Sequence, residues 1–243
     1  MFVAGIPHGA IEYHWHQDER RRKARGPGPR FALVYLVVGM VCTALYSIAP
    51  VPGVIAFLVA SMMHFGLESP DLKTSGLFVV AAPFLVHPDA TLMLFDQLSG
   101  SAAFSTIDHN GARIFGLLGF MALGMEAVAR GQRGPRVAFL VVTFLLLPPV
   151  QAVALYFLCL HSADALDEQW AMRARYWDAA ACHAQTAIAA LAVAGAVGLL
   201  GLTASGWLTV QTAAALAIGF TTPHLFNASV NHNKLRAARP RRS

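Results

Sequence analysis

The stretch "VAFLVVTFLLLPPVQAVALYFLCLHS", residues 137–162, contains no Asp, Glu, Lys or Arg. An apolar run of about 20 residues is long enough to span the hydrocarbon core of a bilayer. The whole chain shares this composition, since 56% of its 243 residues are hydrophobic and 13% are charged, with a mean hydropathy of +0.53. A soluble domain carries about 25% charged residues. The composition therefore indicates an integral membrane protein.

This stretch is one of several apolar blocks along the chain, which lie between charged or proline-containing breaks. They are Phe31–Ala49, Val54–Leu67, Gly76–Phe95, Ala112–Ala129, Val137–Leu160, Ala180–Thr203 and Trp207–Phe226, with a shorter segment at Phe2–Tyr13. We predict an all-α, polytopic transmembrane helical bundle of about 7–9 membrane segments. It forms a single integral membrane domain over residues 1–243, with a basic tail at 231–243. The block Val54–Leu67 needs its flanking residues to reach spanning length.

The prolines Pro148 and Pro149 leave the central block open to three interpretations. It could be one kinked helix, two short helices, or a re-entrant pair that meets at the prolines. The positive-inside rule places the basic segments 18–30, 130–136 and 233–243 in the cytoplasm. Two crossings of the central block bring the tail to that side, so we favour two crossings. The protein is then multi-pass in the inner, cytoplasmic cell membrane, with a cytoplasmic C-terminus.

The formal net charge of +5 does not indicate a nucleic-acid partner. The basic residues gather in the segments predicted to be cytoplasmic, where they orient the protein and contact anionic lipid. The N-terminus lacks a basic start followed by an apolar core, so we expect no cleavable signal peptide.

Four histidines lie in or at the edges of apolar segments that run in the same direction across the membrane: His8, His64, His161 and His224. The charge-based topology places them near one membrane level. A histidine inside an apolar span is costly unless it has a partner or a role. One such residue would most often hydrogen-bond to a neighbouring helix, whereas several at one depth indicate a metal or haem site. His183 is a weaker candidate for the same site.

Two of these histidines precede a glutamate by four residues. "HGAIE" joins His8 to Glu12, and "HFGLE" joins His64 to Glu68. This spacing puts both side chains on one helical face. A metal-bound imidazole usually donates its other ring N–H to a carboxylate or carbonyl oxygen, which either glutamate could supply. The alternative is that both glutamates are acids at the membrane interface.

Four motifs occur in order along most of the chain: "GIPHGAIE" (5–12), "HFGLE" (64–68), "YFLCLHS" (156–162) and "TTPHLF" (221–226). Together they resemble the Brp/Blh-type β-carotene 15,15′-dioxygenase family. The resemblance implies a multi-helix membrane protein that cleaves the central double bond of β-carotene with O2 and gives two retinal molecules. It also implies a non-haem Fe2+ held by histidines, and retinal that often supplies a microbial rhodopsin.

By this resemblance, His8, His64 and His161 match iron-ligand positions of the family. The chain departs from the family pattern at Glu12, where aspartate is usual, and at Leu160, where tryptophan is common. It also has Ala165 where the family has a second histidine, four residues after His161. His224 is the candidate to replace that ligand, and a position in the substrate pocket is its alternative.

A long hydrocarbon dissolved in the bilayer would enter such a site sideways, between helices. The residues that flank the motif histidines and could line its pocket are Met62, Met63, Phe65, Tyr156 and Phe157. Ordinary helix packing is the alternative for each. Two other functions remain open beside the enzyme: a non-catalytic relative that binds carotenoid or retinal, and a bis-histidine haem membrane protein.

Overall fold

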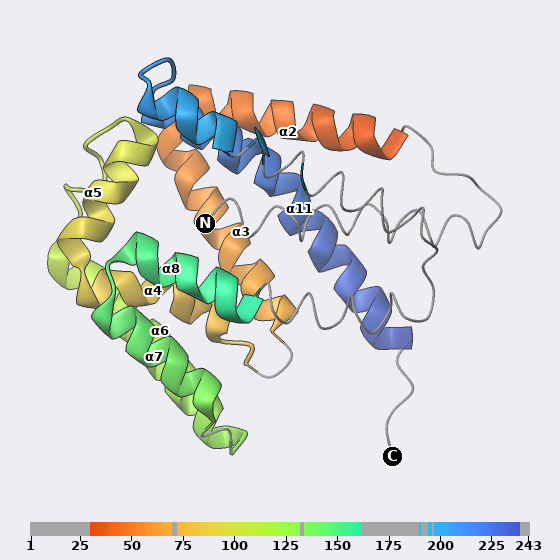
Figure 1. Ribbon diagram of the computed structural model, residues 1–243. Coiled ribbons are helices and arrows are strands. Elements are labelled where there is room, and N and C mark those ends of the chain that lie inside the picture. The colour runs from red at the N-terminus through yellow and green to blue at the C-terminus, as the bar shows by residue number, and fades with distance from the viewer. Residues whose placement is uncertain are drawn as a thin grey trace.

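The computed structural model describes residues 30–69, 72–131 and 134–161, together with 190–238 except 191–193 and 196. Helices make up almost all of these residues, and no strand occurs among them (Figure 1). The helices are α2 (Arg30–Ile48), α3 (Pro50–Glu68), α4 (Ser75–Val86), α5 (Pro88–Ser99), α6 (His109–Ala129), α7 (Pro135–Leu146), α8 (Pro149–Tyr156), the π-helix η1 (Phe157–His161) and α11 (Val210–Ala238). The predicted all-α class is confirmed. Predictions for Phe2–Tyr13, Ala165 and His183 fall outside the described residues.

Three helices lie close to the apolar blocks that predicted them. Helix α2 follows the first block to within one residue at each end. Helix α3 begins at Pro50, whose fixed φ suits the first turn of a helix. The residues that flank Val54–Leu67 therefore lengthen this helix to the length needed for a membrane span. Helix α6 begins after Asp108, whose carboxylate accepts a hydrogen bond from the Gly111 backbone N–H.

The block Gly76–Phe95, predicted as one span, contains two helices, α4 and α5, bent by 112°. The break lies at His87, whose φ of −131° and ψ of 58° are not helical. A residue before proline is disfavoured in the helical conformation, and Pro88 follows His87 directly. The Thr91 hydroxyl lies 2.7 Å from the His87 carbonyl oxygen and 3.0 Å from that of Pro83, so its one O–H donor is shared between two carbonyl oxygens at the corner.

The central proline block forms two short helices. Helix α7 ends at Leu146, and helix α8 begins at Pro149. The two residues between them, Leu147 and Pro148, have an extended backbone. Figure 1 shows α8 turning back beside α4 rather than continuing the line of α7. Of the three interpretations, a continuous kinked helix is therefore wrong. Two crossings of the membrane by this pair remain a prediction.

Helix α11 continues past the predicted end of its span at Phe226 and reaches Ala238. Most of the predicted basic tail is therefore helical, because its Leu, Arg, Lys and Ala residues favour a helix after the apolar part has ended. Helix α11 packs against α2 and α3. The Tyr35 hydroxyl of α2 donates a 2.9 Å hydrogen bond to the Phe220 carbonyl oxygen.

Two helical segments among the described residues are long and apolar enough to cross a membrane, Pro50–Leu67 and His109–Ala129. The bent pair α4–α5 is a third if it forms one span. The predicted total of about 7–9 segments is not confirmed by these residues. Large apolar side chains are exposed along α2 and α6, among them Leu33, Met40, Leu45, Ile114, Met121 and Met125. Such a surface is compatible with a membrane protein, because lipid would cover it.

Candidate metal centre

Helix α3 has one buried face and one exposed face. Val54, Ser61, His64 and Phe65 are buried, at spacings of three, four and seven residues that follow the helical repeat. Met63 is 61% exposed on the opposite side. The helical repeat therefore directs the His64 side chain inward, where its exposed fraction is 1%.

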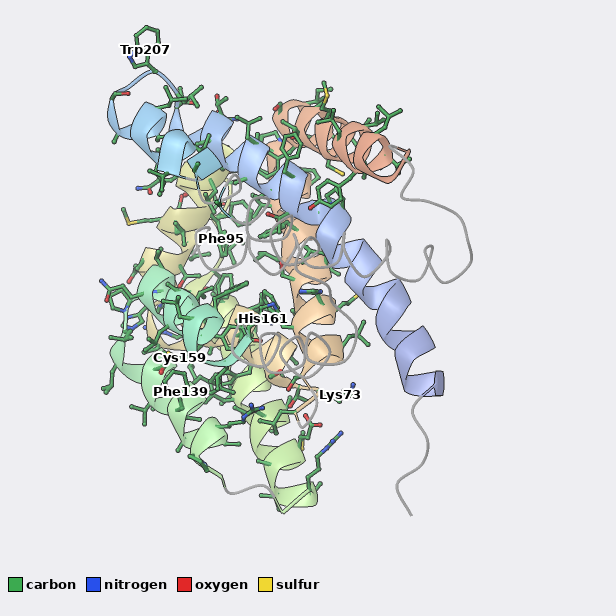
Figure 2. All side chains as sticks on the ribbon, turned by 45° about the vertical axis from the view of Figure 1, so that its right-hand side comes forward. Lys73, Phe95, Phe139, Cys159, His161 and Trp207 are labelled. Carbon is green, nitrogen blue, oxygen red and sulfur yellow. The ribbon has the colours of Figure 1, made fainter. Side chains whose placement is uncertain are left out.

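His161 is the last residue of the π-helix η1, which continues from α8. A π turn takes more residues than an α turn and shifts the faces of a helix, and such turns are frequent at functional sites. In this turn His161 packs on Phe157 and Tyr156, with ring centroids 5.0 and 6.0 Å apart. His161 is 7% exposed and lies between α8 and α3 (Figure 2).

The two histidines meet in the interior although they are far apart in the sequence. The ring centroids of His64 and His161 are 5.4 Å apart, with an interplanar angle of 65°. Phe65 packs edge-on against His161 at 5.3 Å and against Phe157 at 5.1 Å. The site is therefore a pair of buried imidazoles surrounded by aromatic rings.

The turn between α3 and α4 is packed tightly against the end of α3. A Cβ atom on Gly66 would collide with the Lys73 carbonyl oxygen, and one on Gly76 would collide with the Met62 carbonyl oxygen. Glycine is required wherever backbones approach this closely. Gly66 of the "HFGLE" motif therefore serves helix packing beside His64.

Glu126 of α6 holds the same turn in place and was missed by the sequence analysis. Its carboxylate accepts hydrogen bonds from the Lys73 N–H at 2.9 Å and the Thr74 N–H at 2.6 Å, and from the Thr74 hydroxyl at 2.7 Å. It also forms a 2.8 Å ion pair with Arg130. Because these backbone donors lie at the start of α4, Glu126 caps that helix from another helix. Its signal in the sequence was an acid inside an apolar block, four residues before an arginine.

Glu126→Ala should lower the free energy of unfolding by about 1–3 kcal/mol, because it leaves two partly buried N–H groups and the Thr74 hydroxyl without their acceptor. Arg130→Ala is the matched control and should cost less than about 1 kcal/mol, since it removes only an ion pair whose arginine is 42% exposed. Thermal unfolding of both variants in one detergent measures the difference. Equal losses would contradict the capping role.

The structure brings together part of the predicted site. Phe65, Tyr156 and Phe157, predicted to line the pocket, surround the histidine pair, whereas Met62 is half-buried and Met63 is exposed. Helices α3 and α11 contain Glu68 and His224, but the structure does not describe these two side chains. His8 and Glu12 lie outside the described residues. Among the described residues, no group of three or more His, Cys, Asp or Glu side chains is placed to hold a metal ion.

The spacing of the two histidine rings is compatible with a shared metal ion, and imidazole is a suitable ligand. Imidazoles that bind one divalent ion through nitrogens at about 2.1 Å have ring centres roughly 4.5–6 Å apart, and the observed 5.4 Å falls within that range. Packed aromatic rings have a similar spacing. The assignment of His64 and His161 as metal ligands is therefore tested by measuring metal content and not by the distance between the rings. Neutral imidazole is a suitable ligand for Fe2+ among other transition metals.

The fold and the site define a helical protein with apolar outer faces and a pair of imidazoles buried among aromatic rings. The family model described as beta-carotene 15,15'-dioxygenase matches residues 1–226 of the 243. The chain therefore belongs to the β-carotene 15,15′-dioxygenase family, and the resemblance drawn from the four motifs is confirmed. Comparisons with curated proteins and with solved structures find no match.

Proposed function

We propose that the protein is a non-haem iron dioxygenase that cleaves the central 15,15′ double bond of β-carotene with O2 to give two molecules of retinal. The observation that carries this proposal is the buried pair of His64 and His161, in a chain that belongs to this family. His64 belongs to the motif "HFGLE" and His161 to the motif "YFLCLHS", two of the four motifs that resemble the family. Family membership supports a dioxygenase-type activity on a carotenoid.

His8, His64, His161 and His224 would hold the Fe2+, through neutral nitrogens that leave the centre positively charged. When bound, the iron supplies a redox-active centre at which O2 can react, which zinc would not provide. The side chains of the protein would position the substrate beside the histidine pair and exclude water from the site. The rings of Phe65, Tyr156 and Phe157 present apolar surface beside the pair, as a hydrocarbon substrate requires.

The substrate would reach this site from the bilayer. The protein would lie in the inner cell membrane and cross it several times, with its apolar helix faces in contact with lipid. β-Carotene dissolves only in the hydrocarbon layer, so it would pass between helices rather than through an aqueous channel. The retinal product would leave by the same layer, where a microbial rhodopsin could take it up.

The decisive experiment expresses the protein in bacterial cells that make β-carotene. Loss of the carotene colour, with retinal identified by chromatography, is the expected result. The same cells expressing His64→Ala should keep their colour and contain no retinal. Unchanged β-carotene with the native protein, at confirmed expression and iron supply, would contradict the proposal. A strong haem absorption band in the purified protein would favour the bis-histidine haem alternative.

Glu12 and Glu68 are expected to accept the second ring N–H of His8 and His64. Replacing either glutamate with glutamine should then weaken iron retention or turnover by about ten- to a hundredfold, the usual effect of removing such a partner. Asp89→Asn, which neutralises a 73% exposed carboxylate at the start of α5, is the matched control. Unchanged iron content and turnover in both glutamine variants would leave these glutamates as interface acids.

The cytoplasmic position of the C-terminus follows from two crossings by α7 and α8. A reporter that is active only outside the cytoplasm, fused after Ser243, should be inactive. The same count of crossings from the basic segments places residues 96–111 outside, so the reporter fused within 100–108, between α5 and α6, should be active. Activity at the C-terminal fusion would show that the pair makes a single crossing. It would also separate the predicted membrane levels of His161 and His224.

A further inference from the structure

Ser61 lies one turn before His64 on the buried face of α3. Its exposed fraction is 4%, close to the 1% of His64. Residues three apart on a helix are neighbours on its surface, so the hydroxyl and the imidazole line the same side. The Ser61 Oγ atom is buried and makes no hydrogen bond with the part of the chain that the structure describes.

Five other hydroxyl groups in the described helices behave differently, although the hydroxyl of Ser75, the first residue of α4, is also buried without a partner among the described residues. They donate to the carbonyl oxygen four residues earlier, at 2.6–2.9 Å, as Thr43, Ser47, Thr203, Thr221 and Thr222 do. This local bond is the ordinary way for serine or threonine to satisfy its hydroxyl inside a helix. Ser61 does not make it, so its hydroxyl remains available on the side of α3 that carries His64.

A buried polar group without a partner destabilises a protein and calls for an explanation. Alanine at position 61 would fill the same helix face without an unsatisfied hydroxyl. The hydroxyl therefore indicates a ligand atom that can accept a hydrogen bond next to the histidine pair. The Phe65 ring, one turn further along the same buried face of α3, offers no such atom. A hydrocarbon carotene has none either.

The products of the proposed reaction do carry an acceptor. The central double bond breaks, each of its two carbons takes one oxygen atom of O2, and two aldehydes result without any further oxidant. Each carbonyl oxygen is then on the carbon that was nearest the metal. We infer that Ser61 donates a hydrogen bond to the carbonyl oxygen of the aldehyde product. This inference rests on the proposed function and adds a polar contact that discriminates the aldehyde from the hydrocarbon.

The experiment uses the full-length, iron-loaded protein in lipid nanodiscs, without O2, with retinal added. In the native protein, the C=O stretching band of bound retinal should lie below its frequency in a hydrocarbon solvent. Ser61→Ala should return the band towards the solvent value and weaken retinal binding about two- to tenfold, the effect of one neutral hydrogen bond. Binding of β-carotene should not change, and Ser61→Thr, which keeps a hydroxyl, should retain the lower band.

Ser47→Ala is the matched control, because it removes a helix hydroxyl that is already bonded to the Thr43 carbonyl oxygen. A C=O band that is identical in the native protein and in Ser61→Ala would overturn the inference. So would an equal loss of affinity for retinal and β-carotene, which would assign Ser61 to packing. If the native protein makes retinal in cells but the C=O band is the same in the native protein and in Ser61→Ala, only this inference fails. If it makes none, the proposed function fails as well.

Discussion

His64→Ala and His161→Ala should each purify with most of their iron missing. An imidazole that binds the metal directly contributes more than the partners that orient it, whose loss already costs about ten- to a hundredfold in affinity. Loss of either histidine should therefore weaken iron binding by more than about a hundredfold. Iron per protein, measured by elemental analysis after identical purification, gives the result. The two variants should behave alike because their rings are 5.4 Å apart in one buried site.

His109→Ala is the control for this experiment. His109 lies at the start of α6, is 49% exposed, and contacts Asp89 at 3.3 Å. Its removal should leave the iron content unchanged. Native iron content in both His64→Ala and His161→Ala would contradict the assignment of the buried pair as ligands, and the pair would then be a packing contact between α3 and η1.

Much of this fold could be predicted because hydropathy marks membrane-length helices directly. The apolar blocks placed α2, α3 and α6 well, since each is a single helix between breaks in composition. Hydropathy failed at His87, because apolar residues continue on both sides of Pro88 while the backbone turns by 112°. It failed again beyond Phe226, because the apolar part of a segment ends before its helix does.

The histidine pair could be predicted for a different reason. His64 and His161 were joined by a common predicted depth and by two motifs, and the structure places them side by side. The π turn that orients His161 could not be predicted, because every residue from Phe157 to Leu160 is compatible with an α-helix. Ser61 was missed because only its failure to bond to its own helix makes it unusual, and that is a property of the structure.

The second large expected effect is a loss of iron from His224→Ala. It follows from Ala165, which stands where the family has a second histidine. Alanine cannot bind a metal, so under the proposed function either His224 would supply the remaining ligand or three histidines would hold the iron. Helix α11 carries His224 and packs against α3, the helix of His64. If His224 is a ligand, His224→Ala should lose iron as readily as His64→Ala. If it lines the pocket instead, the variant should keep its iron and lose turnover through substrate fit.

Restoring the family residue with Ala165→His tests the same point from the other side. On a helix that continues from His161, position 165 shares the face of His161, so the new imidazole could reach the metal. We expect His224 to be a ligand. Ala165→His should then tighten iron binding, and it should rescue the iron content of the His224→Ala variant. Full iron occupancy in His224→Ala, beside an iron-depleted His64→Ala sample, would show that His224 does not bind the metal. A rescued double variant that also recovers retinal formation would show that the two positions are alternative sources of one ligand, because only an imidazole at the metal could restore both.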